Sequence, residues 1–191
     1  MDEPDTPRVE MLSIVEAEAA AAAAGLPQRM ARLSVFRALL RHPSLAARLA
    51  GMLQMLLGEG NKLDPRLREL IIMRIGWKTR SLYEWTQHWR VARRLDVPEE
   101  HILAVRDWRT SPLLSECDKA VLQATDESLD DGMISDATWA ILARHISAPE
   151  QLIELVAAIG NWTLFSQLLK SLKIPLEEGV APWPPDGRPP P

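Results

Sequence analysis

A segment near the middle of this chain is apolar on almost every side, which leaves few folds open to it. Asp64-Pro65 is a strong helix start signal, because aspartate caps a helix and proline suits its first position. The predicted helix runs to about Lys78, and its stretch from Leu70 to Trp77 is apolar nearly all round. A helix of this kind has to be covered by other helices. The sequence therefore predicts an all-α domain with this helix at its centre.

Helix signals also dominate the rest of the chain, and no segment shows convincing strand alternation. The other helices are expected over residues 9–24, 28–41, 44–57, 82–95, 98–108, 112–129, 136–145 and 148–170. Side chains that can cap helix starts precede four of these segments: Ser44, Thr110 or Ser111, Ser135 and Ser147. Capping-box spacing joins Ser147 to Glu150 and Ser81 to Glu84.

Composition divides the chain into three predicted parts. Residues 1–27 form an alanine-rich helical arm with little to bury, and residues 28–176 form the helical domain. Seven of the 15 prolines lie from Pro175 onward, so residues 177–191 are predicted to be an extended tail.

Charge and cysteine content exclude several function classes. A net charge of −4 gives no electrostatic footprint for nucleic acid, and Arg90, Arg93 and Arg94 are interpreted as a solvated helix face. The acidic N-terminus does not resemble a signal peptide, and no run of about 18 apolar residues predicts a membrane span. Cys117 is the only cysteine, so the chain cannot form an internal disulfide or a CxxC redox pair. We expect a cytoplasmic protein without membrane or nucleic-acid partners.

A weak internal repeat is present. Residues 67–81 match residues 152–166 without a gap, sharing Glu, Trp and Ser at equivalent positions. The second copy has no counterpart of Glu84 or His88, so a site built on these two residues would be single.

Two polar residues fall within the apolar arc of the helix expected over 82–95. At about 100° per residue, Glu84 and His88 lie on the arc that also carries Trp85 and Trp89. Burying a carboxylate or an imidazole costs several kcal/mol unless the group is paired. At this spacing of four residues the two side chains can contact each other. They are the strongest candidates for acid/base chemistry.

Structural roles remain open for these residues. Ser81 and Glu84 have capping-box spacing, so Glu84 could instead bond backbone N–H groups at the start of the helix. His88 has the alternative role of a core histidine bonded to Glu84 or to a carbonyl group. Glu69 is a third candidate, one turn into the central helix beside Gly76, or else an exposed glutamate favoured by the helix dipole.

Residues 63–71, LDPRLRELI, and residues 83–88, YEWTQH, carry a resemblance to a known family, with further similarity at 36–43 and 134–139. They resemble the carboxymuconolactone decarboxylase family, which includes alkylhydroperoxidase D-like proteins. The resemblance implies an all-helical fold with an internal two-fold repeat. It also implies a homo-oligomer, a trimer or hexamer, with sites near subunit contacts.

In the peroxidase members of this family, a glutamate and a histidine serve a CxxC pair as a proton relay. The resemblance places Glu69 and His88 at the relay positions, and Ser81 and Glu84 at the two cysteine positions. Because both sulfurs are absent, we expect no alkylhydroperoxidase activity by disulfide cycling. The decarboxylase members release CO₂ from a carboxylated lactone through a dienolate-like intermediate, which requires an acid or base.

The leading hypothesis is therefore a cofactor-independent acid/base enzyme of the carboxymuconolactone decarboxylase type. Its substrate is expected to be a small carboxylated lactone or related carbonyl acid. His88 would move the proton, Glu84 would orient and tune it, and Glu69 would be a second acid/base group. The substrate-binding residues are expected to be Ser81, Tyr83 and Trp85.

Two alternatives belong to other classes. A non-catalytic member would be an oligomeric helical scaffold or would bind a small ligand, with Glu84 and His88 sealed in packed core. A metal site would need Glu69, Glu84 and His88 within about 2.0–2.2 Å of one ion. The resemblance implies neither a metal nor any other cofactor.

Overall fold

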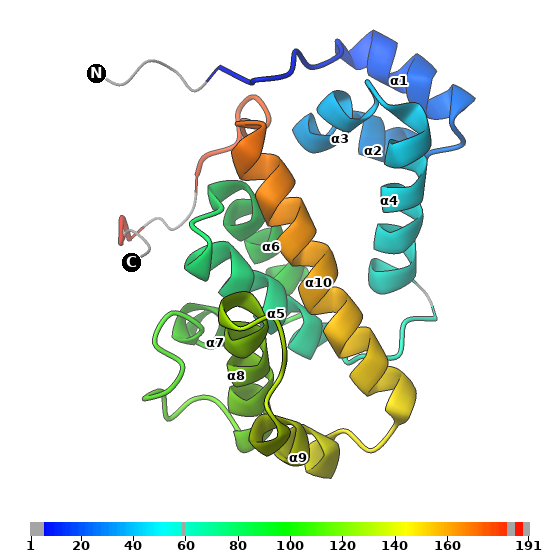
Figure 1. Ribbon diagram of the computed structural model, residues 1–191. Coiled ribbons are helices and arrows are strands. Elements are labelled where there is room, and N and C mark those ends of the chain that lie inside the picture. The colour runs from blue at the N-terminus through cyan, green and yellow to red at the C-terminus, as the bar shows by residue number, and fades with distance from the viewer. Residues whose placement is uncertain (1–5, 59, 183–185, 189–191) are drawn as a thin grey trace. The chain divides into compact units, whose positions relative to one another are not determined.

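The computed structural model describes residues 6–58, 60–182 and 186–188, and within these ranges all regular secondary structure is helical (Figure 1). The expected all-α fold is confirmed. The chain divides into two compact units, residues 1–60 with 167–181, and residues 61–166 with 182–191. The division into arm, domain and tail stays a prediction.

The first unit contains the N-terminal helices. They are α1 (Ile14–Ala23), α2 (Gln28–Ala31), α3 (Ser34–Leu39) and α4 (Pro43–Leu57). The expected start of α1 at Val9 is wrong, because Ser13 and Glu16 form a reciprocal capping box there. The expectation that this arm has little to bury is also wrong in part, since Ala17 and Ala21 of α1 are fully buried.

One helix was expected over residues 28–41, and two short helices are found. The backbone of Leu33 is extended, and the N–H of Ser34 donates to the Glu177 carboxylate at 2.9 Å. This bond replaces a helical one and breaks the segment. The start of α4 also differs from expectation, because His42 is its N-cap, with Nδ1 accepting a bond from the N–H of Leu45.

The second unit is built around α5 (Pro65–Lys78). Asp64 caps this helix by accepting from the N–H of Arg66, and every residue from Leu67 to Trp77 is buried. The predicted central helix is confirmed. The elements that follow in the chain are α6 (Leu82–Arg94), α7 (Glu99–Ala104), α8 (Glu116–Asp130), α9 (Asp136–His145) and α10 (Pro149–Ser171). Within this unit α5 packs against α6 and α8, and α8 packs against α9 (Figure 1).

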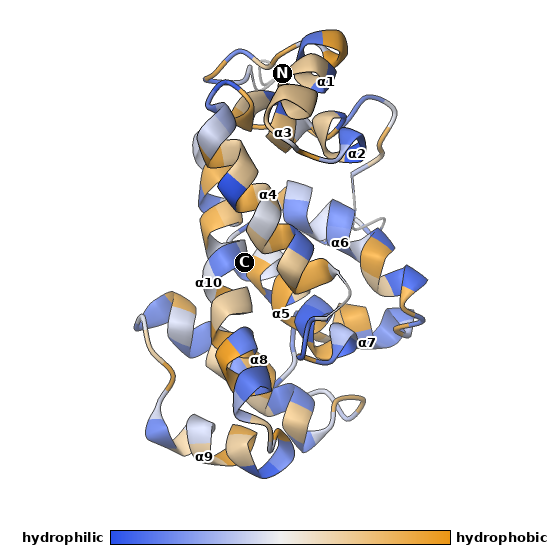
Figure 2. Ribbon diagram, turned by 90° about the vertical axis from the view of Figure 1, so that its right-hand side faces the viewer, coloured by the Kyte–Doolittle hydropathy of each residue, from blue (hydrophilic) through white to orange (hydrophobic). Residues whose placement is uncertain are grey.

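Two helices of this unit are shorter than expected. The segment after α7 forms turns rather than helix, and α8 begins only after Ser115. Ser115 and Asp118 form a capping box, so neither Thr110 nor Ser111 caps α8. Figure 2 shows hydrophobic and hydrophilic segments alternating along α8, as expected for an amphipathic helix. The start of α9, with Ser135 as N-cap, agrees with prediction.

A tight turn joins α5 to α6 and positions the first turn of α6. Arg80 in this turn has φ of 60°, a left-handed conformation. Gly76 permits a close approach of the two helices, because a Cβ atom there would lie 3.1 Å from the backbone nitrogen of Trp85. The turn reverses the chain, so that α5 and α6 pack against each other with their facing residues in contact. In the second sequence copy α10 continues without a turn, and the internal repeat stays a prediction.

By length and apolar composition α10 meets the criteria for a membrane span, whereas no such span is expected from the sequence. Half of its most apolar window is buried inside the protein. Its buried face carries Leu155, Ala158 and Trp162, as in a core helix.

Candidate acid/base site

Helices α5 and α6 bring the three predicted acid/base residues together. Glu69 extends from α5, and Glu84 and His88 extend from α6 one turn apart. The side chain of Glu69 is completely buried, whereas those of Glu84 and His88 remain 6% and 10% exposed. The alternative of Glu69 as an exposed first-turn residue is therefore wrong.

Both ring nitrogens of His88 have partners. Nδ1 lies 2.8 Å from Oε2 of Glu69. On the other side of the ring, the indole N–H of Trp162 donates to Nε2 at 3.0 Å. Because an indole nitrogen is only a donor, Nε2 must act as the acceptor. The proton of the neutral imidazole therefore lies on Nδ1, which donates to Glu69.

Glu84 approaches the same imidazole at a greater distance. Its Oε2 lies 3.5 Å from Nε2 of His88, so the predicted contact exists but is longer than a good hydrogen bond. The short bond that orients the ring comes from Glu69 instead. Among the residues that the structure describes, no hydrogen bond to the Glu84 carboxyl group is seen.

Burial has a large effect on the acidity of Glu84. It raises the pKa of this carboxyl group to about 7, with the charge of Glu69 adding to the rise and His88 opposing it. Both the protonated and the ionised form of Glu84 are therefore accessible near neutral pH. This carboxyl group can both donate and accept a proton under physiological conditions.

The pKa of His88 is also displaced from its ordinary value. Burial lowers this pKa, but the charge and hydrogen bond of Glu69, together with the charge of Glu84, raise it by more. The bond from Trp162 acts against protonation, because it requires the lone pair on Nε2. Protonation of His88 and of Glu84 is therefore coupled, and the two groups titrate as a pair.

Arg68 completes the inner side of the site. Its Nε donates to Oε1 of Glu69 at 3.0 Å, and both side chains are buried. The Glu69 carboxylate thus accepts a hydrogen bond from Arg68 on one oxygen and from His88 on the other. A carboxylate bonded in this way stays fixed and holds the imidazole in one orientation.

Ser81 occupies the N-cap position of α6 but does not cap it. Its side chain makes no bond to the helix start, so the predicted capping box with Glu84 is wrong. The buried Ser81 hydroxyl has no hydrogen-bond partner in the described part of the chain. Tyr83 and Trp85 are also buried, and the Trp85 ring lies 5.2 Å from that of Trp77.

The geometry does not suit the metal alternative. Glu69 lies at Nδ1 of His88 and Glu84 lies at Nε2, so the two carboxylates approach opposite sides of the ring. The three groups cannot converge on one ion in this arrangement. Within the described residues, no cluster of three potential ligands has the geometry of a metal site.

Two residues of the site were not identified from the sequence. Trp162 lies on α10, and it follows His88 by 74 positions in the sequence. No local sequence pattern connects the two residues. The repeat aligned Trp162 with Trp77 but gave it no chemical role. Arg68 stands next to Glu69 in the segment that carried the family resemblance, and its charge beside a buried carboxylate was the available signal.

Comparisons with known proteins agree with this architecture. Residues 43–127 match the model of the Carboxymuconolactone decarboxylase family. The uncharacterized protein YnjA of Escherichia coli (strain K12) is 34% identical over 119 residues, which is 60% of this chain. The match spans 63% of the length of that relative.

Solved structures show the same fold at low sequence identity. The alkylhydroperoxidase AhpD core of an uncharacterized peroxidase-related protein from Ralstonia eutropha JMP134 is 15% identical, with a TM-score of 0.72 over 95% of this chain and 100% of that one. The debrominase Bmp8 in complex with 2,3,4-tribromopyrrole is 19% identical, with a TM-score of 0.68 over 93% of this chain and 94% of that one.

Proposed function

We propose that this chain is a cofactor-independent acid/base enzyme of the carboxymuconolactone decarboxylase type, because residues 43–127 match that family's model, the fold is that of alkylhydroperoxidase D-like structures, and the CxxC pair is absent. Its substrate class is a small carboxylated lactone or a related carbonyl acid. One observation carries this proposal: Glu84 is buried beside His88 with a pKa of about 7. A general acid or base is most effective when its pKa lies near the working pH.

In this proposal Glu84 exchanges the proton with the substrate. His88 tunes Glu84 from Nε2, and Glu69 orients His88 from Nδ1. The roles of Glu84 and His88 are thus exchanged relative to the sequence-based hypothesis. The pKa of about 7 supports this exchange, and the complete burial of the Glu69 side chain supports its role as a group that only orients His88.

The reaction step uses one proton and no redox partner. The bond between the substrate carbon and its carboxylate breaks, CO₂ leaves, and the electron pair enters the conjugated carbonyl system as a dienolate. Protonated Glu84 then donates its proton to a carbon atom of the dienolate. The resulting carboxylate lies beside His88 and regains a proton from solvent, since its pKa is close to neutral.

Ser81 supplies the substrate contact. Its hydroxyl is buried without a described partner at the start of α6, three residues before Glu84. Leaving a buried hydroxyl unpaired costs roughly 1–3 kcal/mol, and a substrate oxygen that accepts its hydrogen bond would recover that cost. Tyr83 and Trp85, buried on the same turns of α6, are proposed to close the apolar side of the substrate site.

The experiment compares wild type with Glu84→Gln and His88→Asn, using carboxymuconolactone as substrate. CO₂ release and deuterium incorporation from heavy water are measured together. Both variants should lose about a hundredfold or more in turnover, the usual scale of general acid/base catalysis. Glu100→Gln, a change of an exposed glutamate, is the matched control and should turn over like wild type.

A non-catalytic scaffold is the rival, and one observation favours it. Both nitrogens of His88 already have partners within the protein, as in a structural core histidine. In that case wild type would show no deuterium incorporation, and His88→Asn would lower the melting temperature. This pair of results would overturn the enzyme proposal.

A further inference from the structure

A second cavity lies away from the acid/base site, between α8, α9 and the turns before α8. Its volume is about 420 Å³, within the range of small-molecule sites, and it is partly open to solvent. Apolar atoms make most of the lining, from Trp108, Leu114, Ala120 and Ile141. None of the residues assigned to the acid/base site contributes to it.

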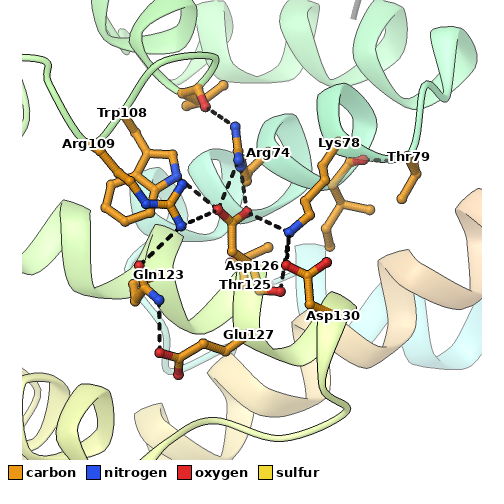
Figure 3. A network of polar contacts seen from close by, with 12 residues as sticks. Arg74, Lys78, Thr79, Trp108, Arg109, Gln123, Thr125, Asp126, Glu127 and Asp130 are labelled. Carbon is orange, nitrogen blue, oxygen red and sulfur yellow. Dashed lines mark hydrogen bonds and ion pairs between the residues drawn. The ribbon is translucent and has the colours of Figure 1, made fainter. Parts of the chain in front are cut away.

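The aromatic wall of this cavity is held rigidly. The indole N–H of Trp108 donates to Oδ2 of Asp126 at 3.2 Å, and the Arg109 guanidinium lies 4.3 Å from the centre of the Trp108 ring (Figure 3). Arg109 is itself paired with Asp126 at 3.2 Å. Asp126 is in turn fixed by two bonds from Arg74. The indole therefore presents a preorganised apolar surface to a ligand.

Most polar groups of the lining already have partners. Glu116 pairs with Arg144 and His145 across the gap to α9. Gln123 donates to Glu127, and so does the hydroxyl of Thr138.

Lys119 is the exception. It lines the cavity half-buried, and no ion pair of its ammonium group is found in the described ranges. An apolar wall with one uncompensated cation at its edge is complementary to an apolar body that carries one negative charge.

We propose that this cavity binds a small monocarboxylate with an aromatic or aliphatic body, its apolar part on Trp108 and its carboxylate on Lys119. A carboxylate that accepts from the ammonium group gains a charge-assisted hydrogen bond. This proposal does not depend on the proposed enzyme activity. The two are separable because the variants below leave Glu84 and His88 unchanged.

The test is calorimetric titration of the full chain with 2-naphthoate, and with the neutral amide 2-naphthamide. Wild type should bind 2-naphthoate with one site per chain and bind the amide at least about tenfold more weakly, as expected for loss of a hydrogen bond to a charged group. Lys119→Met should weaken the binding of 2-naphthoate by a similar factor and leave the affinity for 2-naphthamide unchanged. Ile141→Trp, which fills the cavity from α9, should abolish binding of both.

Lys170→Met makes the same substitution at an exposed site on α10 and should leave both affinities unchanged. Circular dichroism and melting temperature establish that each variant is folded. The proposal is overturned if wild type does not bind 2-naphthoate at millimolar concentration, or if Lys119→Met and Lys170→Met bind it equally well. The proposal is also overturned if 2-naphthoate binding disappears at protein concentrations where the chain associates into a larger oligomer. A second copy of the chain would then cover the cavity.

Discussion

The indole N–H of Trp162 donates a hydrogen bond to Nε2 of His88 at 3.0 Å, across 74 residues of sequence. This contact, with the Glu69 carboxylate at Nδ1, determines the tautomer of the imidazole. It also ties α10 to α6 through a buried bond within the second unit. A proton can reach Nε2 only if the Trp162 bond is given up.

Trp162→Phe removes this donor while keeping an aromatic ring in the core. With the lone pair of Nε2 released, the pKa of His88 should rise above its wild-type value, because Glu69 and Glu84 favour the imidazolium. The variant should lose roughly 1–3 kcal/mol of stability, the cost of an unpaired buried polar group. Nitrogen NMR of the imidazole, followed through a pH titration, measures the shift.

Trp108→Phe is the control for this experiment. It deletes a buried indole N–H that is bonded to Asp126 instead of His88. It should cost stability without moving the His88 titration. An unchanged or lower His88 pKa in Trp162→Phe would contradict the role given to this bond.

Helix periodicity located much of the acid/base site. The buried arc of α6 placed Glu84 and His88 together because the spacing of four residues is a local property of a helix. The partner that actually orients His88 is Glu69 on another helix, and that pairing depends on how α5 packs against α6. The capping box at Ser81 failed for a related reason, since spacing alone does not determine a side-chain rotamer.

Helix interiors were predicted better than helix ends. Asp64-Pro65 and the apolar run after it predicted both ends of α5, because capping and burial agree there. The break between α2 and α3 could not be predicted, since the Ser34 N–H bonds to Glu177, which is 143 positions away. Ser115 was overlooked as the start of α8 although its capping-box partner Asp118 was visible in the sequence.

Protonation of Glu84 should make stability depend on pH. Its folded-state pKa of about 7 lies above the ordinary value of 4.5, so the stabilising contribution is complete below 4.5 and is lost as pH rises to about 7. At 1.4 kcal/mol per pKa unit, the loss is on the order of 3 kcal/mol. Glu84→Gln should remove this slope, and urea denaturation at several pH values measures it.

Glu150→Gln is the control for the pH series, because Glu150 is an exposed glutamate in the first turn of α10. It should keep the wild-type slope. The raised pKa of Glu84 is contradicted if the unfolding free energy of wild type, measured relative to that of Glu84→Gln, does not fall between pH 4.5 and 7.

Cys117 should be chemically inert. Burial raises the pKa of its thiol, and the charge of Asp118 adds to the rise, so little thiolate is present at neutral pH. Reaction with an aromatic disulfide reagent should be at least about tenfold slower than that of free cysteine at the same pH. Cys117→Ser should keep the wild-type melting temperature. Peroxide turnover that Cys117→Ser abolished would show that a thiol mechanism operates after all.

The chain should form a homo-oligomer, as the family resemblance implies. Large apolar side chains lie exposed along one side of α10: Ile153 is 70% exposed, Val156 45% and Leu164 41%. Apolar surface of this kind is characteristic of an interaction site. Light scattering at micromolar concentration should give a trimer or hexamer mass, and Ile153→Asp should lower it. A monomer mass for wild type would refute this expectation.

The ion pair between Arg74 and Asp126 should be among the most sensitive points of the fold (Figure 3). The guanidinium donates to both Asp126 oxygens, at 2.6 and 2.9 Å, and to two backbone carbonyls of the turns after α7. Asp126→Asn leaves Arg74 buried without its counter-charge, and should cost about 3–5 kcal/mol.

Low pH should act on the same pair. Burial raises the pKa of Asp126, but the hydrogen bond and charge of Arg74, with Lys78 and Trp108, lower it by more. The folded-state pKa therefore lies below the ordinary value, so this carboxylate stabilises the protein above that value and the contribution is lost as pH falls below about 4. The Asp126→Asn variant should not show this loss of stability at low pH, because it has no carboxylate to protonate at this position.

A double-mutant cycle separates the pair from its surroundings. Arg74→Met combined with Asp126→Leu removes both charges, and should recover much of the stability lost in either single variant, because no buried charge is left alone. Glu18→Gln breaks the exposed pair with Arg32, and should change stability by less than about 1 kcal/mol. If Asp126→Asn costs no more than Glu18→Gln in chemical denaturation, the Arg74–Asp126 pair does not stabilise the second unit in the way its geometry indicates.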